Sequence, residues 1–146
     1  MIWHTKGTGP RVKNAKKTTL DVDGKPHTFP SHAEAARYLQ LKCLQKAGIV
    51  TEIELQPEFE LQPAYWQCCG KSYRDGMMGI LHCPKCKKKV HKIRSIIYRA
   101  DFRVTYTDGH QEIEDVKGME TEIFKLKRKM FEYRYPDLTL IVRKVR

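Results

Sequence analysis

The stretch YRADFRVTYTDGHQEIEDVKG (residues 98–118) decides the fold. β-Branched and aromatic residues lie on both sides of Asp108-Gly109, a dipeptide typical of tight hairpin turns. We predict one long strand over residues 93–106 and an antiparallel partner over residues 111–117. A single hairpin is marginally stable in water, so other elements must cover its apolar face.

This hairpin also carries the polar side chains of interest. Side chains alternate along a strand, so Asp115 and Lys117 share one face, whereas Glu114 and Val116 share the other. If the turn is centred as predicted, Asp101 lies opposite Val116 and diagonal to both Asp115 and Lys117. Whether Asp101 shares their face depends on the register, which a bulge would shift by one residue.

Two carboxylates beside a lysine suit phosphodiester hydrolysis. Carboxylates bind Mg²⁺ or Mn²⁺, hard cations that prefer oxygen ligands. Such a metal polarises the scissile phosphate and acidifies a bound water, and a nearby lysine orients the water or neutralises developing charge. Taken alone, an Asp-x-Lys motif is better explained as a structural ion pair on the surface.

Two helices are expected outside the hairpin. The first begins at Ser31, where Glu34 completes a capping box, and it ends near Gly48. Its predicted apolar stripe, which places Cys43 in the core, is Ala36, Leu39, Cys43 and Ala47. The second helix covers residues 120–133, and its predicted buried stripe is Ile123, Leu126, Met130 and Tyr133.

Further strands complete an α/β core with a mixed central sheet flanked by helices. They are predicted as a hairpin over residues 20–29 around Asp23-Gly24, strands at 49–55 and 59–61, and a last strand at 138–142. The expected organisation is a basic arm (1–17), a core (18–63 and 93–146), and a small zinc-ribbon-like insertion (64–92).

The insertion contains four of the five cysteines. Cys83-Pro84-Lys85-Cys86 has the spacing of one half of a zinc knuckle. Cys68 and Cys69 supply the other half, although adjacent cysteines require an unusual backbone to bind one ion. Cys69 with His91 is the alternative pair. Since four protein ligands leave no open position, we expect the Zn²⁺ to be structural.

Charge favours a polyanionic partner. The chain has 28 Lys and Arg against 17 Asp and Glu, a net charge of +11, and neutralised phosphates release counterions. The candidate DNA-binding residues are Lys85, Lys87, Lys88, Lys89, Lys92 and Arg94 around the cysteines, with Lys125 and Lys129 on the second helix. With neither a long apolar run nor an apolar leader, we expect a soluble, cytoplasmic protein that does not bind membranes.

The pattern of acid, Asp-x-Lys strand and acid-bearing helix resembles the PD-(D/E)xK nuclease superfamily. More narrowly, the chain is similar to a phage and prophage family of small proteins catalogued within it as a domain of unknown function. The matching residues are Asp23-Gly24, Phe29-Pro30-Ser31, Glu34, Arg37-Tyr38, Gln56-Pro57-Glu58-Phe59, Asp101-Phe102, Glu114-Asp115-Val116-Lys117-Gly118 and Phe124-Lys125-Leu126-Lys127-Arg128-Lys129. The chain departs from the superfamily pattern at Ala100, where proline is usual.

The resemblance implies a restriction-endonuclease-like core and a set of site residues. Asp101 and Asp115 would bind Mg²⁺ with the carbonyl of Val116, and Lys117 would act on the water. Glu34 would complete the metal shell, directly or through water, although its role in the capping box is an equally good explanation.

Three functions follow as hypotheses. The first is a Mg²⁺-dependent DNA endonuclease of phage recombination or replication, with branched DNA as one candidate substrate, in the host cytoplasm if phage-encoded. The second is a non-catalytic zinc-ribbon DNA-binding protein on a nuclease-like core. The third is the endonuclease subunit of a transposase-like machine, which usually needs a further domain. Symmetric cutting of both strands would favour a homodimer.

Overall fold

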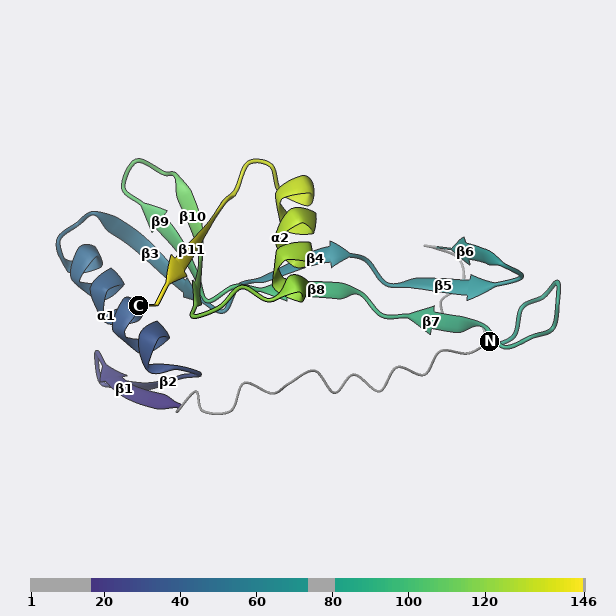
Figure 1. The fold of residues 1–146 in the computed structure, drawn as a ribbon, viewed down its shortest axis with the longest axis horizontal. Coiled ribbons are helices and arrows are strands. Elements are labelled where there is room, and N and C mark those ends of the chain that lie inside the picture. Colours follow the sequence, from purple (N-terminus) through teal and green to yellow (C-terminus); the bar gives the residue numbers. More distant parts are fainter. Residues whose placement is uncertain (1–16, 74–80, 146) are drawn as a thin grey trace.

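A computed structural model of the chain describes residues 17–73 and 81–145. Within these residues it contains two helices and several small sheets (Figure 1), so the predicted mixed α/β class is confirmed. The predicted basic arm lies, except for Lys17, outside the described residues. No described helix is long and apolar enough to cross a membrane.

The central sheet has four strands in the spatial order β11-β10-β9-β3. Their bounds are β3 Val50–Leu55, β9 Phe102–Tyr106, β10 Gln111–Lys117 and β11 Thr139–Lys144. β10 pairs antiparallel with β9 and parallel with β11, which makes the sheet mixed, as expected. β10 therefore has a neighbour on both sides, and its carboxylates lie at the centre of the molecule.

The prediction of one long strand over residues 93–106 is wrong. The chain forms three strands here, namely β7 His91–Ile93, β8 Ile96–Arg99 and β9. The break before β9 arises because the N–H of Ala100 donates to the carbonyl of Pro57, whereas that of Asp101 donates to the carbonyl of Glu114. Neighbouring backbone groups thus bond to different segments, and β8 leaves the central sheet.

α1 (His32–Lys46) covers one face of the central sheet. Ser31 is its N-cap, as predicted, but the predicted apolar stripe is wrong, because Leu39 and Cys43 are exposed. The buried residues of the helix include Tyr38 and Leu41, and the Tyr38 ring stacks on Phe102 of β9 with centroids 6.3 Å apart. Aromatic stacking on the sheet therefore sets the rotation of α1, which apolar spacing alone does not reveal.

α2 (Glu122–Arg134) covers the opposite face and begins at Thr121, whose Oγ1 accepts a hydrogen bond from the N–H of Phe124. The predicted buried stripe is wrong here as well. Ile123, Leu126 and Tyr133 are exposed, and Met130 is only partly buried. Apolar side chains lie on two faces of α2. The face that packs against the sheet is not the predicted one but the face that carries Phe124 and Phe131.

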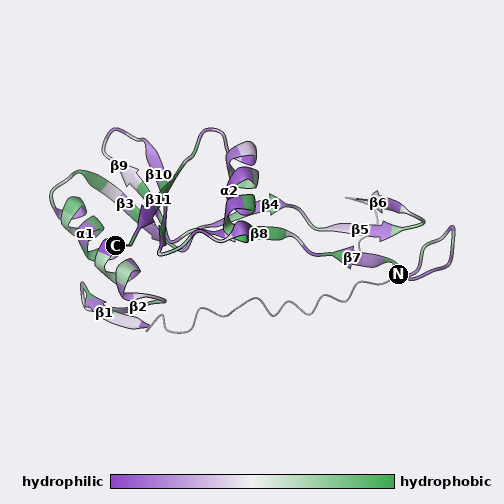
Figure 2. Cartoon of the chain, in the orientation of Figure 1, coloured by the Kyte–Doolittle hydropathy of each residue, from purple (hydrophilic) through white to green (hydrophobic). Residues whose placement is uncertain are grey.

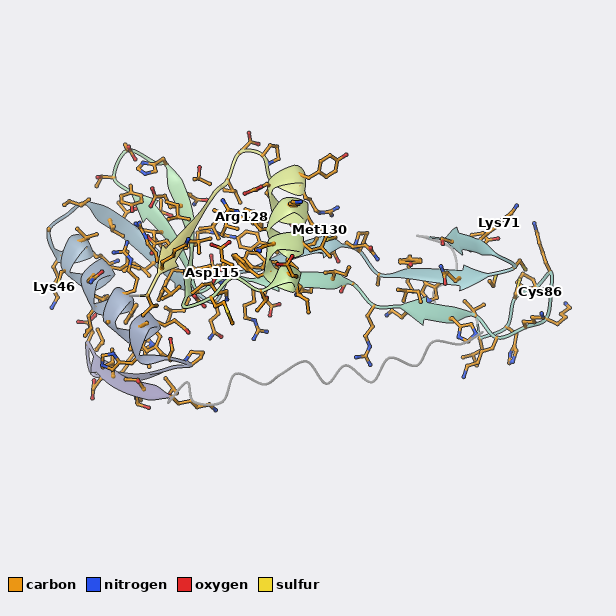
Figure 3. All side chains as sticks on the ribbon, in the orientation of Figure 1. Lys46, Lys71, Cys86, Asp115, Arg128 and Met130 are labelled. Atoms are coloured by element: carbon orange, nitrogen blue, oxygen red, sulfur yellow. The ribbon has the colours of Figure 1, made fainter. Side chains whose placement is uncertain are left out.

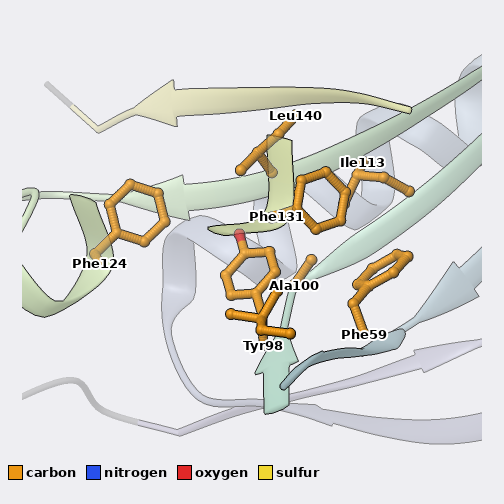
Figure 4. Packing of buried hydrophobic residues seen from close by; sticks show 8 residues of the cluster. Phe59, Tyr98, Ala100, Ile113, Phe124, Phe131 and Leu140 are labelled. Carbon is orange, nitrogen blue, oxygen red and sulfur yellow. The ribbon is translucent and has the colours of Figure 1, made fainter. Parts of the chain in front are cut away.

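Phe124 and Phe131 are the buried residues of α2. Phe131 meets the edge of the Phe59 ring with centroids 4.9 Å apart and also contacts Tyr98 (Figure 4). These two phenylalanines each bury a large apolar ring among the aromatic and apolar side chains of the core. This aromatic cluster fixes α2 beside the end of β10.

The remaining described strands form small pairs and a separate sheet. The hairpin of β1 Thr18–Val22 and β2 Lys25–Phe29 turns at Asp23-Gly24, as predicted, and both turn residues have positive φ. β4 (Glu58–Gln62) pairs antiparallel with β8, and we call these two strands the connector. The connector leads to the distal sheet, which consists of β5 (Tyr65–Cys68), β6 (Lys71–Tyr73) and β7 (Figure 1).

Candidate active site and metal centre

The pairing of β9 with β10 brings the two predicted aspartates close together. Glu114 pairs with Phe102 and Glu112 with Val104, so the register differs by one residue from the predicted one. This register ends at Phe102, because the N–H of Asp101 donates to the carbonyl of Glu114 and so shifts the pairing by one residue. The electrostatic effect of Asp115 on Asp101 shows that the two carboxyl groups are close, and Asp101 also lines a cavity with Glu34.

Asp115 is completely buried and both of its oxygens have a close neighbour. Its Oδ2 accepts a hydrogen bond of 2.7 Å from the hydroxyl of Tyr98. Its Oδ1 lies 2.8 Å from the Nζ of Lys117 in an ion pair, and it accepts no hydrogen bond from the part of the chain that the structure describes. Burial, and then the charge of Asp115, raises the pKa of Tyr98 far above its usual value, so Tyr98 remains a hydrogen-bond donor.

Asp101 lies in the bend before β9, beside the backbone of β10. Its Oδ2 accepts a hydrogen bond of 2.6 Å from the N–H of Val116. Burial raises the pKa of Asp101 to about 7, and the charges of Asp115 and Glu34 add to this effect against the opposing influence of the Val116 N–H. The carboxyl therefore has a cost of ionisation that a nearby cation would offset.

Glu34 approaches the same place from α1. Its Oε1 accepts a hydrogen bond of 2.8 Å from the Ser31 hydroxyl, while its backbone N–H donates to Ser31 Oγ at 3.2 Å. Burial raises the pKa of Glu34. Together with Asp101 and Gln56 it lines a cavity of about 150 Å³. Glu34 thus caps the helix and also presents its carboxyl to the cavity beside Asp101.

The side chain of Lys117 extends from the buried carboxylate of Asp115 to the protein surface. Its side chain is 34% exposed, and its Nζ lies 5.3 Å from the centre of the Phe124 ring on α2. A groove of about 450 Å³ opens beside it. The residues along this groove include Arg99, Met119, Ile123 and Lys127. Figure 3 shows Asp115 in the region between the central sheet and α2.

Glu114 faces away from these groups, as the strand alternation predicts. It is completely buried on the α1 side, where Arg37 donates to it through Nε at 2.7 Å and Nη2 at 2.6 Å. Arg143 of β11 donates a further bond of 2.8 Å. Although burial alone would raise the pKa of Glu114, these hydrogen bonds lower it. Glu114 is therefore a structural anion that ties α1 to β11 across β10.

Three cysteine sulfurs gather at the tip of the distal sheet. The Sγ atoms of Cys68, Cys69 and Cys83 lie within 4.8 Å of one another, and Cys69 Sγ is 3.4 Å from Cys83 Sγ. Cys86 joins them, because its thiol interacts with that of Cys69 and its backbone N–H lowers the pKa of Cys83 to about 6. This four-cysteine set is compatible with a structural Zn²⁺.

The backbone explains how adjacent cysteines reach one centre. Cys69 and Gly70 both have positive φ and form the tight turn between β5 and β6. On the other side, the N–H of Lys87 donates to the carbonyl of Cys83, and Lys87 itself has a φ of 58°. Among the described residues the group of three close sulfurs contains no histidine, and the alternative ligand His91 stays a prediction.

A protein family of unknown function matches most of this chain. Residues 11–146 match a family described as "Protein of unknown function (DUF1064)". The chain belongs to this family. No curated protein and no solved structure matches it. Membership in a family of unknown function agrees with the resemblance, whereas the nuclease activity of this DUF1064 protein stays a prediction.

The predicted DNA-binding residues of the DUF1064 protein lie at two places. Around the cysteines, Lys85, Lys87, Lys88, Lys89, Lys92 and Arg94 are all exposed. Lys92 Nζ lies 5.5 Å from the centre of the Trp66 ring. On α2, Lys125 and Lys129 are exposed, and Lys125 forms an ion pair of 2.7 Å with Glu122.

Sequence reasoning missed two partners of the carboxylates. Tyr98 was assigned to a strand without a role, and Arg143 was not considered at all. Both lie far along the chain from the groups they bind, because the Tyr98–Asp115 and Arg143–Glu114 contacts span 17 and 29 residues. The signal that would reveal them is a buried acid on β10, which needs donors from its neighbouring strands.

Proposed function

We propose that this protein is a Mg²⁺-dependent DNA endonuclease that hydrolyses phosphodiester bonds in phage recombination or replication. The observation that carries the proposal is the convergence of Asp101 and Asp115 beside Lys117. Asp115 lies 2.8 Å from the lysine, and Asp101 binds the backbone of the residue between them. The mixed α/β core and the resemblance to the nuclease superfamily support this interpretation.

The donor set fits a divalent cation. Asp101, Asp115 and Glu34 interact electrostatically around the single ammonium of Lys117, so the carboxylates outnumber the lysine by two charges when all are ionised. Among the described residues, Asp115 Oδ1 accepts no hydrogen bond and forms an ion pair with Lys117, so a hard cation would take the place of the ammonium group at this oxygen. When bound, the metal polarises the phosphate and lowers the pKa of a bound water.

The protein's own groups have distinct tasks in this proposal. Tyr98 holds Asp115 through Oδ2, so that Oδ1 faces Lys117, and the N–H of Val116 holds Asp101 through its Oδ2. Lys117 reaches from Asp115 towards the groove, where it can orient the attacking water or stabilise charge on the phosphate. Arg99 and Lys127 line the same groove and supply positive charge for the DNA backbone.

Cleavage of labelled duplex, flap and four-way-junction DNA, with Mg²⁺ or with a chelator, tests the proposal. We expect Mg²⁺-dependent cutting of at least one substrate, and about a 100-fold or greater loss in Asp115→Asn and Lys117→Ala. Asp108→Asn is the matched control, because Asp108 is an exposed carboxylate in the turn of the same hairpin. The proposal fails if no substrate is cut or if Asp115→Asn cuts as well as wild type.

A non-catalytic DNA-binding protein is the second candidate. The density of exposed lysines around the cysteine cluster, away from the carboxylates, favours it. It predicts salt-sensitive DNA binding that is the same with Mg²⁺ or chelator and is unchanged in Lys117→Ala. The same purified variants therefore separate the two candidates.

A further inference from the structure

α2 has a second apolar face that the central sheet does not cover. Its exposed side chains include Ile123 (71% exposed), Leu126 (60%) and Tyr133 (89%), with the partly buried Met130 between them. Met119, just before the helix, is 71% exposed. These large apolar side chains follow one another on one element, whereas single exposed apolar residues are ordinary.

Their spacing makes them one seam. The seam residues, Ile123, Leu126, Met130 and Tyr133, alternate steps of three and four positions along α2, the repeat that helices use to pack against one another, and Met119 precedes them outside the helix. At 100° per residue the seam points about 130° away from Phe124 and Phe131, which bind the sheet. α2 therefore presents one apolar face to its own core and another outward.

Charges beside the seam are ordered along the helix. Glu122 and Lys129 lie on the same flank of the seam, seven residues apart, and both are exposed. On the other flank, Glu120 lies near the start of α2, while Lys127 and Arg134 lie further along. The seam is thus acidic at its beginning and basic at its end.

We propose that the seam binds the α2 of a second copy of this chain, with the two helices antiparallel. In this arrangement Ile123 packs beside Leu126 of the second copy. Glu122 then lies next to Lys129 of the second copy, twice by symmetry. A parallel pair would bring Glu122 next to Lys127 but also Lys129 next to Arg134, so that repulsion offsets the attraction, whereas the antiparallel pair has no such repulsion.

The interface also reaches the candidate active site. Met119 and Ile123 line the groove beside Lys117, so the second copy forms part of one wall of that groove in each subunit. The proposal itself does not depend on nuclease activity, because it rests on the seam and its charges. Its test measures assembly only.

Sedimentation over a range of protein concentrations provides the test. We expect wild type to dimerise reversibly. Glu122→Lys and Lys129→Glu each place two like-charged pairs in the symmetric dimer, and each should weaken dimerisation about tenfold. An equimolar mixture of the two variants restores opposite charges at both places, so it should form a heterodimer, and the double variant should regain the wild-type homodimer.

Glu132→Lys is the matched control, since Glu132 lies on the same helix but away from the seam and pairs with Arg128. It should dimerise like wild type, and circular dichroism should show that every variant is folded. Leu126→Asp should be monomeric. The proposal is overturned if wild type stays monomeric throughout, if Leu126→Asp still dimerises, or if the mixture associates no better than either variant alone.

Discussion

At the scale of single residues, the two acids of β10 have opposite surroundings. Asp115 is held by one tyrosine and one lysine and keeps an oxygen without a hydrogen bond. Both carboxylate oxygens of Glu114, the preceding residue, accept hydrogen bonds from arginines, Arg37 and Arg143. Strand alternation alone sends one acid to the α2 side and the other to the α1 side. Loss of the groups that hold Asp115 should therefore impair the candidate site, whereas substitution of Glu114 should lower the stability of the fold.

Removal of the Tyr98 hydroxyl should impair the candidate site without unfolding the protein. In Tyr98→Phe the ring still fills the aromatic cluster, but Asp115 Oδ2 loses its donor. Under the proposed function we expect about a 10- to 100-fold loss of metal affinity or of cleavage rate. Calorimetric titration with Mg²⁺ and cleavage kinetics measure the two effects. Unchanged values in both would exclude a positioning role for Tyr98.

Substitution of Glu114 should act on stability. In Glu114→Gln the two partly exposed arginine partners, Arg37 and Arg143, lose their buried counter-charge. We expect the free energy of unfolding to fall by about 3 kcal/mol at neutral pH. Because the folded protein lowers the pKa of Glu114, its contribution is present above the unfolded pKa and is lost as pH falls through the lowered value.

Urea unfolding of wild type and Glu114→Gln at a series of pH values measures this difference, which should shrink in acid. Glu58→Gln is the control, since Glu58 pairs with Arg99 in an exposed position on the connector. That pair should contribute little at any pH. A difference between wild type and Glu114→Gln that grows in acid would contradict the assignment.

At the scale of elements, the hairpins were predictable and the helix faces were not. Turn dipeptides at Asp23-Gly24 and Asp108-Gly109 locate both hairpins, because these residues accept the turn backbone. The register of β9 and β10 was wrong by one residue, since turn chemistry does not fix the count of paired residues. The buried faces of α1 and α2 depend on rings from other strands, which local spacing cannot include.

The candidate site was predictable to a similar extent. Asp101, Asp115 and Lys117 follow from one hairpin, because their proximity is set by local pairing. Tyr98 could not be placed, because its role depends on the break at Ala100 and on the departure of β8 from the central sheet. Cys86 and Cys83 were recognisable by spacing, whereas Cys68 and Cys69 needed the positive-φ turn to become plausible partners.

The cysteine cluster gives the prediction that belongs to the distal sheet. We expect about one Zn²⁺ per chain by elemental analysis, and its loss in Cys83→Ser. Amide signals of β5, β6 and β7 should then lose dispersion while those of the central sheet persist. Cys43→Ser is the matched control, because Cys43 is an exposed cysteine on α1, remote from the cluster in the sequence. Full zinc content in Cys83→Ser would rule out the four-cysteine site.

At the scale of the whole molecule, polar and apolar character are divided along its length. Figure 2 shows stronger hydrophobic colouring along β8 than along β5. Lys46 on α1 lies at the opposite end of the molecule from Lys71 and Cys86 in the distal part (Figure 3). The core therefore holds the buried carboxylates, and the distal part holds the cysteines and many exposed lysines. Binding and chemistry should be separable by mutation.

Neutralising three distal lysines should weaken DNA binding and spare the cutting step. In the triple variant Lys87→Gln, Lys88→Gln and Lys89→Gln we expect weaker DNA binding. The slope of the logarithm of the binding constant against the logarithm of the salt concentration should become shallower by up to about 0.9 for each phosphate contact that is lost. The cleavage rate at saturating DNA should stay within about twofold of wild type, since no carboxylate is touched. Fluorescence anisotropy and single-turnover kinetics measure both. An equal loss in both quantities would show that the distal sheet belongs to the site.

The length of the connector can be compared with distances along a nucleic acid. A strand advances about 3.3 Å per residue, close to the 3.4 Å between successive bases of a DNA strand. Under the proposed function, β4 and β8 act as a ruler between the place where DNA is held and the place where it is cut. Lengthening both strands by two residues each keeps side-chain facing and should move the cut by about two nucleotides from a fixed junction. Sequencing-gel mapping of the cut position would read that displacement directly.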